Sequence, residues 1–184
     1  MVKKLKGKEW YEIVAPKLFK GRVIGEALVT DPAEALKRSM VVNYTQMDGN
    51  PSKYYIKIKL KADKVEEGKI FMKYAGHECQ RDYLAQMIRK RTLRIDNRII
   101  TETKDNKKLI IKTLGISLTK TKTTIKSKVG KNISELMDKK VREMKFDDVV
   151  KSILSDELQK NVRKEVNKIY PLMRFEVRKL EVLN

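Results

Sequence analysis

The sequence contains few of the residue types on which most catalytic and metal sites depend. Among its 184 residues it has one cysteine, Cys79, and one histidine, His77. A single cysteine excludes an intrachain disulfide framework and a four-ligand cluster for zinc. We therefore interpret His77 as a loop histidine and Cys79 as a half-buried thiol, and we expect neither a metal nor a cofactor.

Common catalytic motifs are also absent. There is no glycine-rich phosphate loop, no Gly-x-Gly-x-x-Gly motif, no serine nucleophile elbow and no metal-binding box. Glu66–Glu67 and Asp147–Asp148 are adjacent acidic pairs, whose members point apart on a strand or helix, and a turn and a helix cap account for them. We predict that the protein is not an enzyme.

Long apolar runs are missing as well. No stretch of 18 apolar residues could span a membrane, and the basic N-terminus is not followed by the apolar core of a signal peptide. We expect a cytoplasmic protein that does not bind membranes. The 41% of hydrophobic residues is enough for a core, since the usual share is about 45–50%.

Acidic residues are absent from one long stretch, Asn106 to Ser134, which carries eight lysines. Its second half, the basic segment (residues 119–131), alternates cations with hydroxyls and has little to bury. Such a segment repels itself, so we expect it to stay mobile or to lie along a polyanion. The lysines that we predict to contact such a polyanion there are Lys120, Lys122, Lys126, Lys128 and Lys131.

Positive charge also dominates the whole chain. The 43 Lys and Arg residues exceed the 24 Asp and Glu residues, which gives a net charge of +19. A compact domain with this charge works against its own repulsion unless an anion shares its surface, and nucleic acid is the leading partner. Other cations predicted to bind RNA lie in a basic tail (residues 1–20), in the segment after it and near residue 90: Lys3, Lys4, Lys6, Lys8, Lys17, Lys20, Arg22, Arg89, Lys90, Arg91 and Arg94.

Two of these groups have alternative interpretations. Trp10 and Tyr11 follow the lysines of residues 1–8 and could either anchor the tail to the body or stack on a base. Apolar residues from about 80 to 91 recur at helical spacing and predict an amphipathic helix that ends in Arg89–Arg91. Cations in a last turn interact favourably with the helix dipole, but four in six residues exceed that need and favour phosphate contact.

Alternating residues predict most of the strands. Residues 23–30 and 40–44 indicate two strands, and a third alternates from Tyr54 to Lys61, with Tyr54 on the buried face and Tyr55 beside the lysines. Residues 70–74 repeat this pattern. A hairpin follows with its turn at Lys104–Lys107, and its second strand leads into the basic segment.

The last fifty residues indicate helices and a closing strand. Asn132 or Ser134 could cap one helix, Asp147 a second and Ser155 a third, and residues 173–177 alternate as a strand. We predict an α+β fold, a mostly antiparallel β-barrel with one inserted helix and a C-terminal helical segment closed by a final strand. A single domain would cover residues 21–184.

Short motifs in order along nearly the whole chain carry a family resemblance. They are Trp10-Tyr11-Glu12-x-x-Ala15-Pro16, Ile24-Gly25-x-x-Leu28-Val29-Thr30, Leu36-Lys37, Gly76 with Arg81-Asp82, Ile169-Tyr170-Pro171-Leu172 and Val177-Arg178-Lys179. This series resembles the small-subunit ribosomal protein family called S-three-a-e, also eukaryotic-type S-one. Asp105-Asn106 stands where the family often has Asp-Gly, which keeps the hairpin turn.

The resemblance implies a ribonucleoprotein role in translation. It implies a β-barrel core with packed helices and a structural place in the small ribosomal subunit, on the platform near the messenger RNA exit. The implied partners are ribosomal RNA, neighbouring platform proteins and, near the exit, messenger RNA. Eukaryotic members have longer tails, so the shorter chain indicates an archaeal member. The family supplies no catalytic residues, and its basic segment corresponds to Lys120 through Lys131.

Two other function classes are alternatives to the ribosomal role. One is a free-standing single-stranded nucleic-acid binding module with Tyr55 and Tyr74 as stacking surfaces. The other is an RNA-modifying enzyme, which would need a cofactor pocket that no motif indicates. Lysine outnumbers arginine in the basic segment, which favours neutralisation of phosphates over the reading of bases, because ammonium lacks the planar fork of guanidinium.

Overall fold

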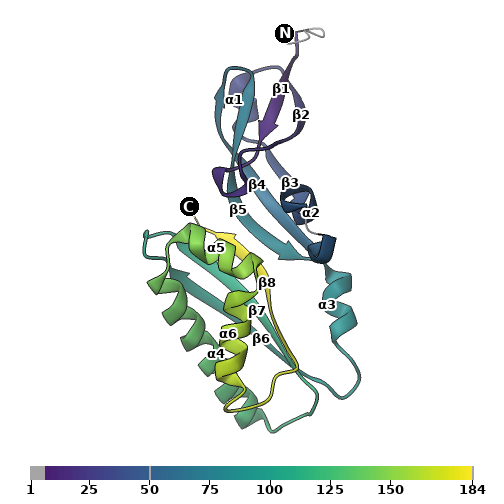
Figure 1. Ribbon diagram of the computed structural model, residues 1–184, viewed down its shortest axis with the longest axis vertical. Coiled ribbons are helices and arrows are strands. Elements are labelled where there is room, and N and C mark those ends of the chain that lie inside the picture. The colour runs from purple at the N-terminus through teal and green to yellow at the C-terminus, as the bar shows by residue number, and fades with distance from the viewer. Residues whose placement is uncertain (1–6, 50, 184) are drawn as a thin grey trace. The chain divides into compact units, whose positions relative to one another are not determined.

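The computed structural model describes residues 7–49 and 51–183 and is drawn in Figure 1. The chain forms two compact units, Met1–Glu78 and Cys79–Asn184. The expected basic tail over residues 1–20 already contains a strand, β1 (Glu9–Val14). Lys3, Lys4 and Lys6 lie outside the described residues. The expected division into a tail and one domain stays a prediction.

The first unit is built on a mixed sheet. Its strands follow the order β2-β1-β5-β4-β3, with β1 antiparallel to β2 and parallel to β5. The other strands are β2 (Val23–Val29), β3 (Ser39–Asn43), β4 (Ile56–Glu66) and β5 (Lys69–Cys79). Short helical turns connect them: η1 (Lys17–Phe19), α1 (Pro32–Ala35), α2 (Tyr44–Asp48) and η2 (Pro51–Lys53).

Strand β4 confirms the clearest alternation in the sequence. Ile56, Ile58 and Leu60 are buried. The assignment of the two tyrosines before them was wrong, since Tyr55 is buried and Tyr54 is 55% exposed. The strand begins only at Ile56, so the two tyrosines lie in a turn to which the alternation of a strand does not apply.

The second unit packs helices on an antiparallel sheet. Strand β7 (Lys108–Ser117) lies between β6 (Leu93–Glu102) and β8 (Arg174–Val182). The helices are α3 (Arg81–Met87), α4 (Thr123–Glu143), α5 (Phe146–Leu154) and α6 (Glu157–Val166). Figure 1 shows α4, α5 and α6 on one face of this sheet. Helix α3 covers part of the other face through Met87, which packs with Leu114 and Ile116.

The predicted closed barrel was wrong. In the first unit the strand order ends at β2 and at β3, and β1 and β5 run parallel, while β6 of the second unit pairs only with β7, so the described strands form an open, mixed arrangement. Closure would require another strand to pair with the outer edge of β6. Helix α4 lies beside β6, and Arg94, Asp96 and Arg98 alternate along this strand as exposed charged residues, which suits an edge.

Helix α4 also corrects the expected start of the C-terminal helices. It begins at Thr123, nine residues before Asn132, so most of the basic segment is helical. The reason is an apolar stripe at every fourth residue, formed by Ile125, Val129, Ile133, Met137 and Val141. The last four of these are at most 1% exposed. Burial of this stripe stabilises a helix that its polar residues alone would not favour.

The start of α5 depends on a residue that is distant in sequence. Asp147 was expected to cap this helix, but Asp147 lies inside its first turn. The Oδ2 atom of Asp105, from the β6–β7 turn, instead accepts a hydrogen bond of 3.0 Å from the backbone N–H of Phe146. Lys107 from the same turn lies 4.1 Å from the centre of the Phe146 ring. The hairpin turn thus supplies the cap.

Candidate nucleic-acid interface

The predicted RNA-binding cations separate into groups with different surroundings. Lys8 is exposed beside β1, and Lys17, Lys20 and Arg22 are exposed between β1 and β2. Arg89, Lys90 and Arg91 were expected to end a helix, but α3 stops at Met87 and all three follow it. Arg91 has a positive φ of 68°, which is typical of a tight turn and incompatible with a continuing helix.

Arg94 differs from the others because its charge is already paired. Its guanidinium donates hydrogen bonds of 2.6 and 3.0 Å to the two carboxylate oxygens of Asp96. The hydrogen bond to Asp96 raises the pKa of Arg94. This bidentate pair engages the Nε and Nη2 donors of the guanidinium, which could otherwise donate to a phosphate. The role of Arg94 in RNA binding stays a prediction.

The first half of α4 concentrates unpaired positive charge. Lys122 precedes the helix, and Lys126, Lys128 and Lys131 are exposed along its basic half (Thr123–Lys131). Within residues 7–49 and 51–183, none of these four has a carboxylate oxygen within 4.0 Å. The first turn contains no acidic residue either. The positive end of the helix dipole therefore adds to the charge of the lysines.

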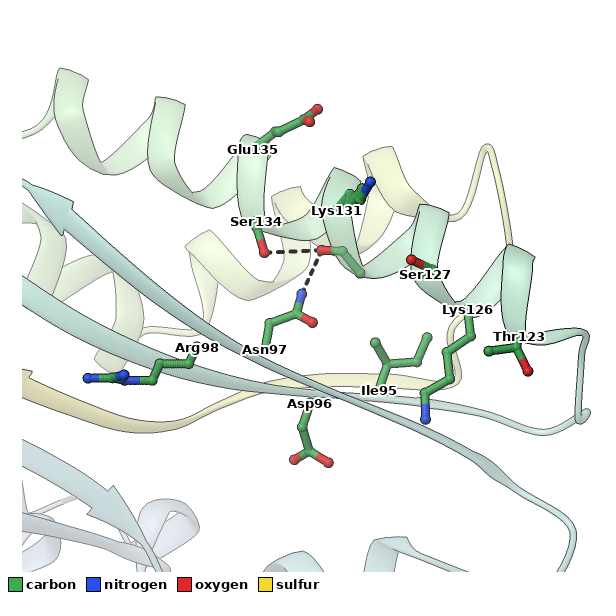
Figure 2. A pocket seen from close by; sticks show the side chains of 11 residues that line it. Ile95, Asp96, Asn97, Arg98, Thr123, Lys126, Ser127, Lys131, Ser134 and Glu135 are labelled. Carbon is green, nitrogen blue, oxygen red and sulfur yellow. Dashed lines mark hydrogen bonds between the residues drawn. The ribbon is translucent and has the colours of Figure 1, made fainter.

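One side of the basic half is fixed to the sheet. Val129 is completely buried, and the Nδ2 atom of Asn97 on β6 donates a hydrogen bond of 2.8 Å to the carbonyl oxygen of Gly130. Ser134 Oγ donates to the same oxygen at 3.1 Å, and Figure 2 shows both bonds. A Cβ atom at position 130 would lie 3.2 Å from Asn97 Oδ1, so glycine permits this close approach. The lysines consequently project from an anchored helix.

Between this helix and the edge strand lies a groove of about 640 Å³, which we call the β6–α4 groove. Its lining combines cations with hydroxyl and amide groups, and Figure 2 shows Lys126 extending from α4 toward β6. The lining residues are Ile95, Asp96, Asn97, Arg98, Thr123, Lys126, Ser127, Gly130, Lys131, Ser134 and Glu135. Arg98, Asn97, Thr123 and Ser127 were not among the predicted site residues.

The electrostatic character of the β6–α4 groove is positive. Three cations, Arg98, Lys126 and Lys131, line it together with two acids, Asp96 and Glu135. Arg94 already neutralises Asp96. The strand alternation that exposes Arg94, Asp96 and Arg98 on one face could have identified Arg98 from the sequence. The approach of β6 to α4 could not have been identified, because it joins residues 33 apart.

The proposed stacking surfaces of a single-strand module were wrong. Tyr55 and Tyr74 are buried, so neither ring can receive a base. Tyr74 instead makes a hydrogen bond of 2.6 Å to Nδ1 of His77. His77 lies in β5 rather than in a loop, and burial lowers its pKa to about 4. This imidazole therefore stays neutral near pH 7.

Trp10 and Tyr11 lie in β1, where Trp10 is 37% exposed and Tyr11 is half-buried. Their role as an aromatic anchor or a stacking pair stays a prediction. Among the described residues there is no group of three or more His, Cys, Asp or Glu side chains that could hold a metal ion. No helix in that part of the chain is long and apolar enough to cross a membrane.

Comparisons with known proteins agree on one family. The sequence profile of the ribosomal S3Ae family matches residues 1–184. The chain is 34% identical to the small ribosomal subunit protein eS1 of Methanothermobacter thermautotrophicus, over 97% of this chain and 91% of the relative. It is 33% identical to eS1 of Methanobrevibacter smithii, over 97% and 93% of the two chains. For eS1 of Sulfurisphaera tokodaii the identity is 31%, over 98% and 93%.

Proposed function

Because the chain belongs to the ribosomal S3Ae family, we propose that it is a structural component of the small ribosomal subunit and binds ribosomal RNA there. The observation that carries this proposal is the match over the full length of the sequence to relatives named as small-subunit proteins. The resemblance seen in the sequence motifs is thereby confirmed at the level of the family. The named relatives are archaeal.

The surface chemistry supports a role as an RNA-binding scaffold. A net charge of +19 matches a polyanionic partner, as do the lysines on the basic half of α4 that have no carboxylate partner in the described part of the chain. Lysine contacts phosphates as a point charge, so most of the affinity would be independent of base sequence. Specificity would then arise from the shape of the folded RNA.

A more exact location extends the same proposal. The protein would lie on the platform near the messenger RNA exit of a cytoplasmic ribosome, beside other platform proteins and within reach of messenger RNA. This location rests on the family resemblance alone. The family is not one of enzymes, and the protein would contribute to translation by holding RNA in place.

Co-sedimentation tests this function against the alternative of a free-standing binding module. After a wash in high salt, a structural component should remain with purified small subunits, because many contacts hold it at once. A module in exchange should dissociate, since its binding depends on few phosphate contacts and weakens steeply with salt. Complete loss in the wash would contradict the structural role. Burial of Tyr55 and Tyr74 already weakens the alternative.

A further inference from the structure

We propose that the β6–α4 groove binds the ribose–phosphate backbone of one RNA strand, with Arg98 and Lys126 at phosphates and the hydroxyls of Thr123 and Ser127 at 2′-OH groups. This inference rests on the proposed function and assigns it a specific site. It differs from a general attraction of RNA to lysines because it names hydroxyl groups that distinguish ribose from deoxyribose.

The lining of the groove favours a sugar–phosphate backbone over bases. Of the eleven lining residues only Ile95 is a large apolar residue, and none is aromatic. Base recognition by single-strand binding proteins depends on aromatic platforms, which this groove does not offer. Ammonium, guanidinium and hydroxyl groups are instead the partners that phosphates and ribose use. The groove would therefore bind RNA with little preference for sequence.

The helix start strengthens the site for an anion. Thr123 and Ser127 are four residues apart and so lie on the same face of α4, next to Lys126. The first turn has no acidic residue and no side-chain cap, and the N–H groups of Ile125 and Lys126 donate to the carbonyl oxygen of Lys122. A phosphate near this end would interact with the helix dipole and with lysines that have no carboxylate partner among the described residues.

The acidic groups of the groove do not oppose this assignment. Asp96 is held by Arg94 through two hydrogen bonds, so the pair is neutral. Glu135 lies beyond Lys131, four residues along the helix, and Figure 2 shows its side chain directed away from β6. Arg98, which alternates with Asn97 along β6, and Lys126 of α4 both line the groove and have no carboxylate oxygen within 4.0 Å among the described residues.

Two double variants test the two parts of the proposal in the full-length protein. Thr123→Val with Ser127→Ala removes both hydroxyls without changing charge. Arg98→Ala with Lys126→Ala removes both cations. Lys151→Ala with Lys160→Ala is the charge-matched control, because both lysines are exposed on α5 and α6, outside the groove. Circular dichroism and urea unfolding establish that each variant is folded.

The probes are a single-stranded uridine 12-mer and its deoxyuridine counterpart, titrated at several salt concentrations. We expect the parent to prefer the RNA. The hydroxyl variant should bind the RNA roughly three- to tenfold more weakly, while binding of the DNA stays unchanged. The cation variant should bind both more weakly, with a slope of log K against log salt that is flatter by about 1.4.

Two results would overturn the proposal. One is an RNA preference in the hydroxyl variant equal to that of the parent, or no preference in the parent. The other is a slope in the cation variant that matches the Lys151 and Lys160 control. If the parent still co-sediments with small subunits in high salt, only the groove assignment fails. If the parent itself washes off, the proposed function fails.

Discussion

The two halves of α4 have the same buried stripe but opposite electrostatic surroundings. In the paired half (Asn132–Glu143), Arg142 lies 2.9 Å from Asp138, and Lys140 lies 2.7 Å from Glu165 of α6. In the basic half, Lys126, Lys128 and Lys131 have no such partner among the described residues. Lysine and arginine also suit the end of a helix but not its start. The two halves differ in how many of their cations have carboxylate partners, and we therefore predict that the basic half rather than the paired half binds RNA.

The largest expected effect concerns the buried apolar stripe, which both halves of α4 share. Met137→Ala should lower the free energy of unfolding by about 2–5 kcal/mol, because Met137 is fully buried in the stripe and its truncation leaves a cavity. Urea unfolding measures this change. Leu136→Ala is the control, since Leu136 is only half-buried, and its effect should be clearly smaller. Equal losses would show that the stripe does not anchor α4.

The next prediction compares the two halves of α4 by their contribution to RNA binding. Replacement of Lys122, Lys126 and Lys128 with alanine should flatten the slope of log K against log salt by roughly two, because each phosphate contact contributes about 0.7–0.9. Titration of a single-stranded RNA at several salt concentrations provides the slope.

The matching control replaces Lys139, Lys140 and Arg142 with alanine. It removes the same formal charge from the paired half and should flatten the slope by less than one, because two of these cations already have carboxylate partners. If the two triple variants gave the same slope, total charge would explain binding and the comparison would fail.

A smaller effect concerns the polar tether of the basic half. Asn97→Ala removes the hydrogen bond to the carbonyl oxygen of Gly130 and should cost about 0.5–1.5 kcal/mol. Hydrogen exchange should accelerate more over residues 123–131 than over residues 132–143. Ser134→Ala, which removes the other side-chain donor to that oxygen, should change exchange less because it leaves β6 attached. Uniform acceleration along α4 would contradict this.

The smallest effect depends on pH and belongs to the paired half. The hydrogen bond from Lys140 lowers the pKa of Glu165. A carboxyl group with a lowered pKa stabilises the folded state above its unfolded pKa, and this contribution disappears as the pH falls through the folded pKa. Lys140→Met should therefore cost at most about 1 kcal/mol at pH 7, since the pair is partly exposed and screened by salt.

Two measurements check this prediction. Urea unfolding should show that the parent and the Lys140→Met variant converge in stability in acid. An NMR titration of the Glu165 carboxyl carbon should show a higher pKa in the variant. A difference in stability that grew as the pH fell would have the wrong sign for this ion pair.

Periodic patterns made much of the fold predictable. The alternation in β4, the hairpin of β6 and β7 and the closing strand β8 were all expected from the sequence, and the structure has them. The stripe from Ile125 to Val141 was equally regular. Its first two members were missed because the surrounding lysines and threonines suggested a chain without structure.

Features that join distant residues were not predictable. The open sheet depends on which strands remain unpaired at their edges, and no local pattern records this. The cap on α5 comes from Asp105, which is 41 residues away from Phe146. The candidate site was identified only in part. The lysines of the basic segment were expected, whereas Arg98 and Asn97 entered the site only because β6 lies beside α4.

The sequence by itself determined the excess of positive charge, the family and the buried faces of most strands, because composition and periodicity are properties of the chain alone. The tertiary structure decided which cations have partners, where α4 begins and that a groove lies beside β6. The physical reason is that ion pairing and burial depend on distances in space. Lys140 and Glu165 are 25 residues apart in sequence, yet their charged atoms are 2.7 Å apart.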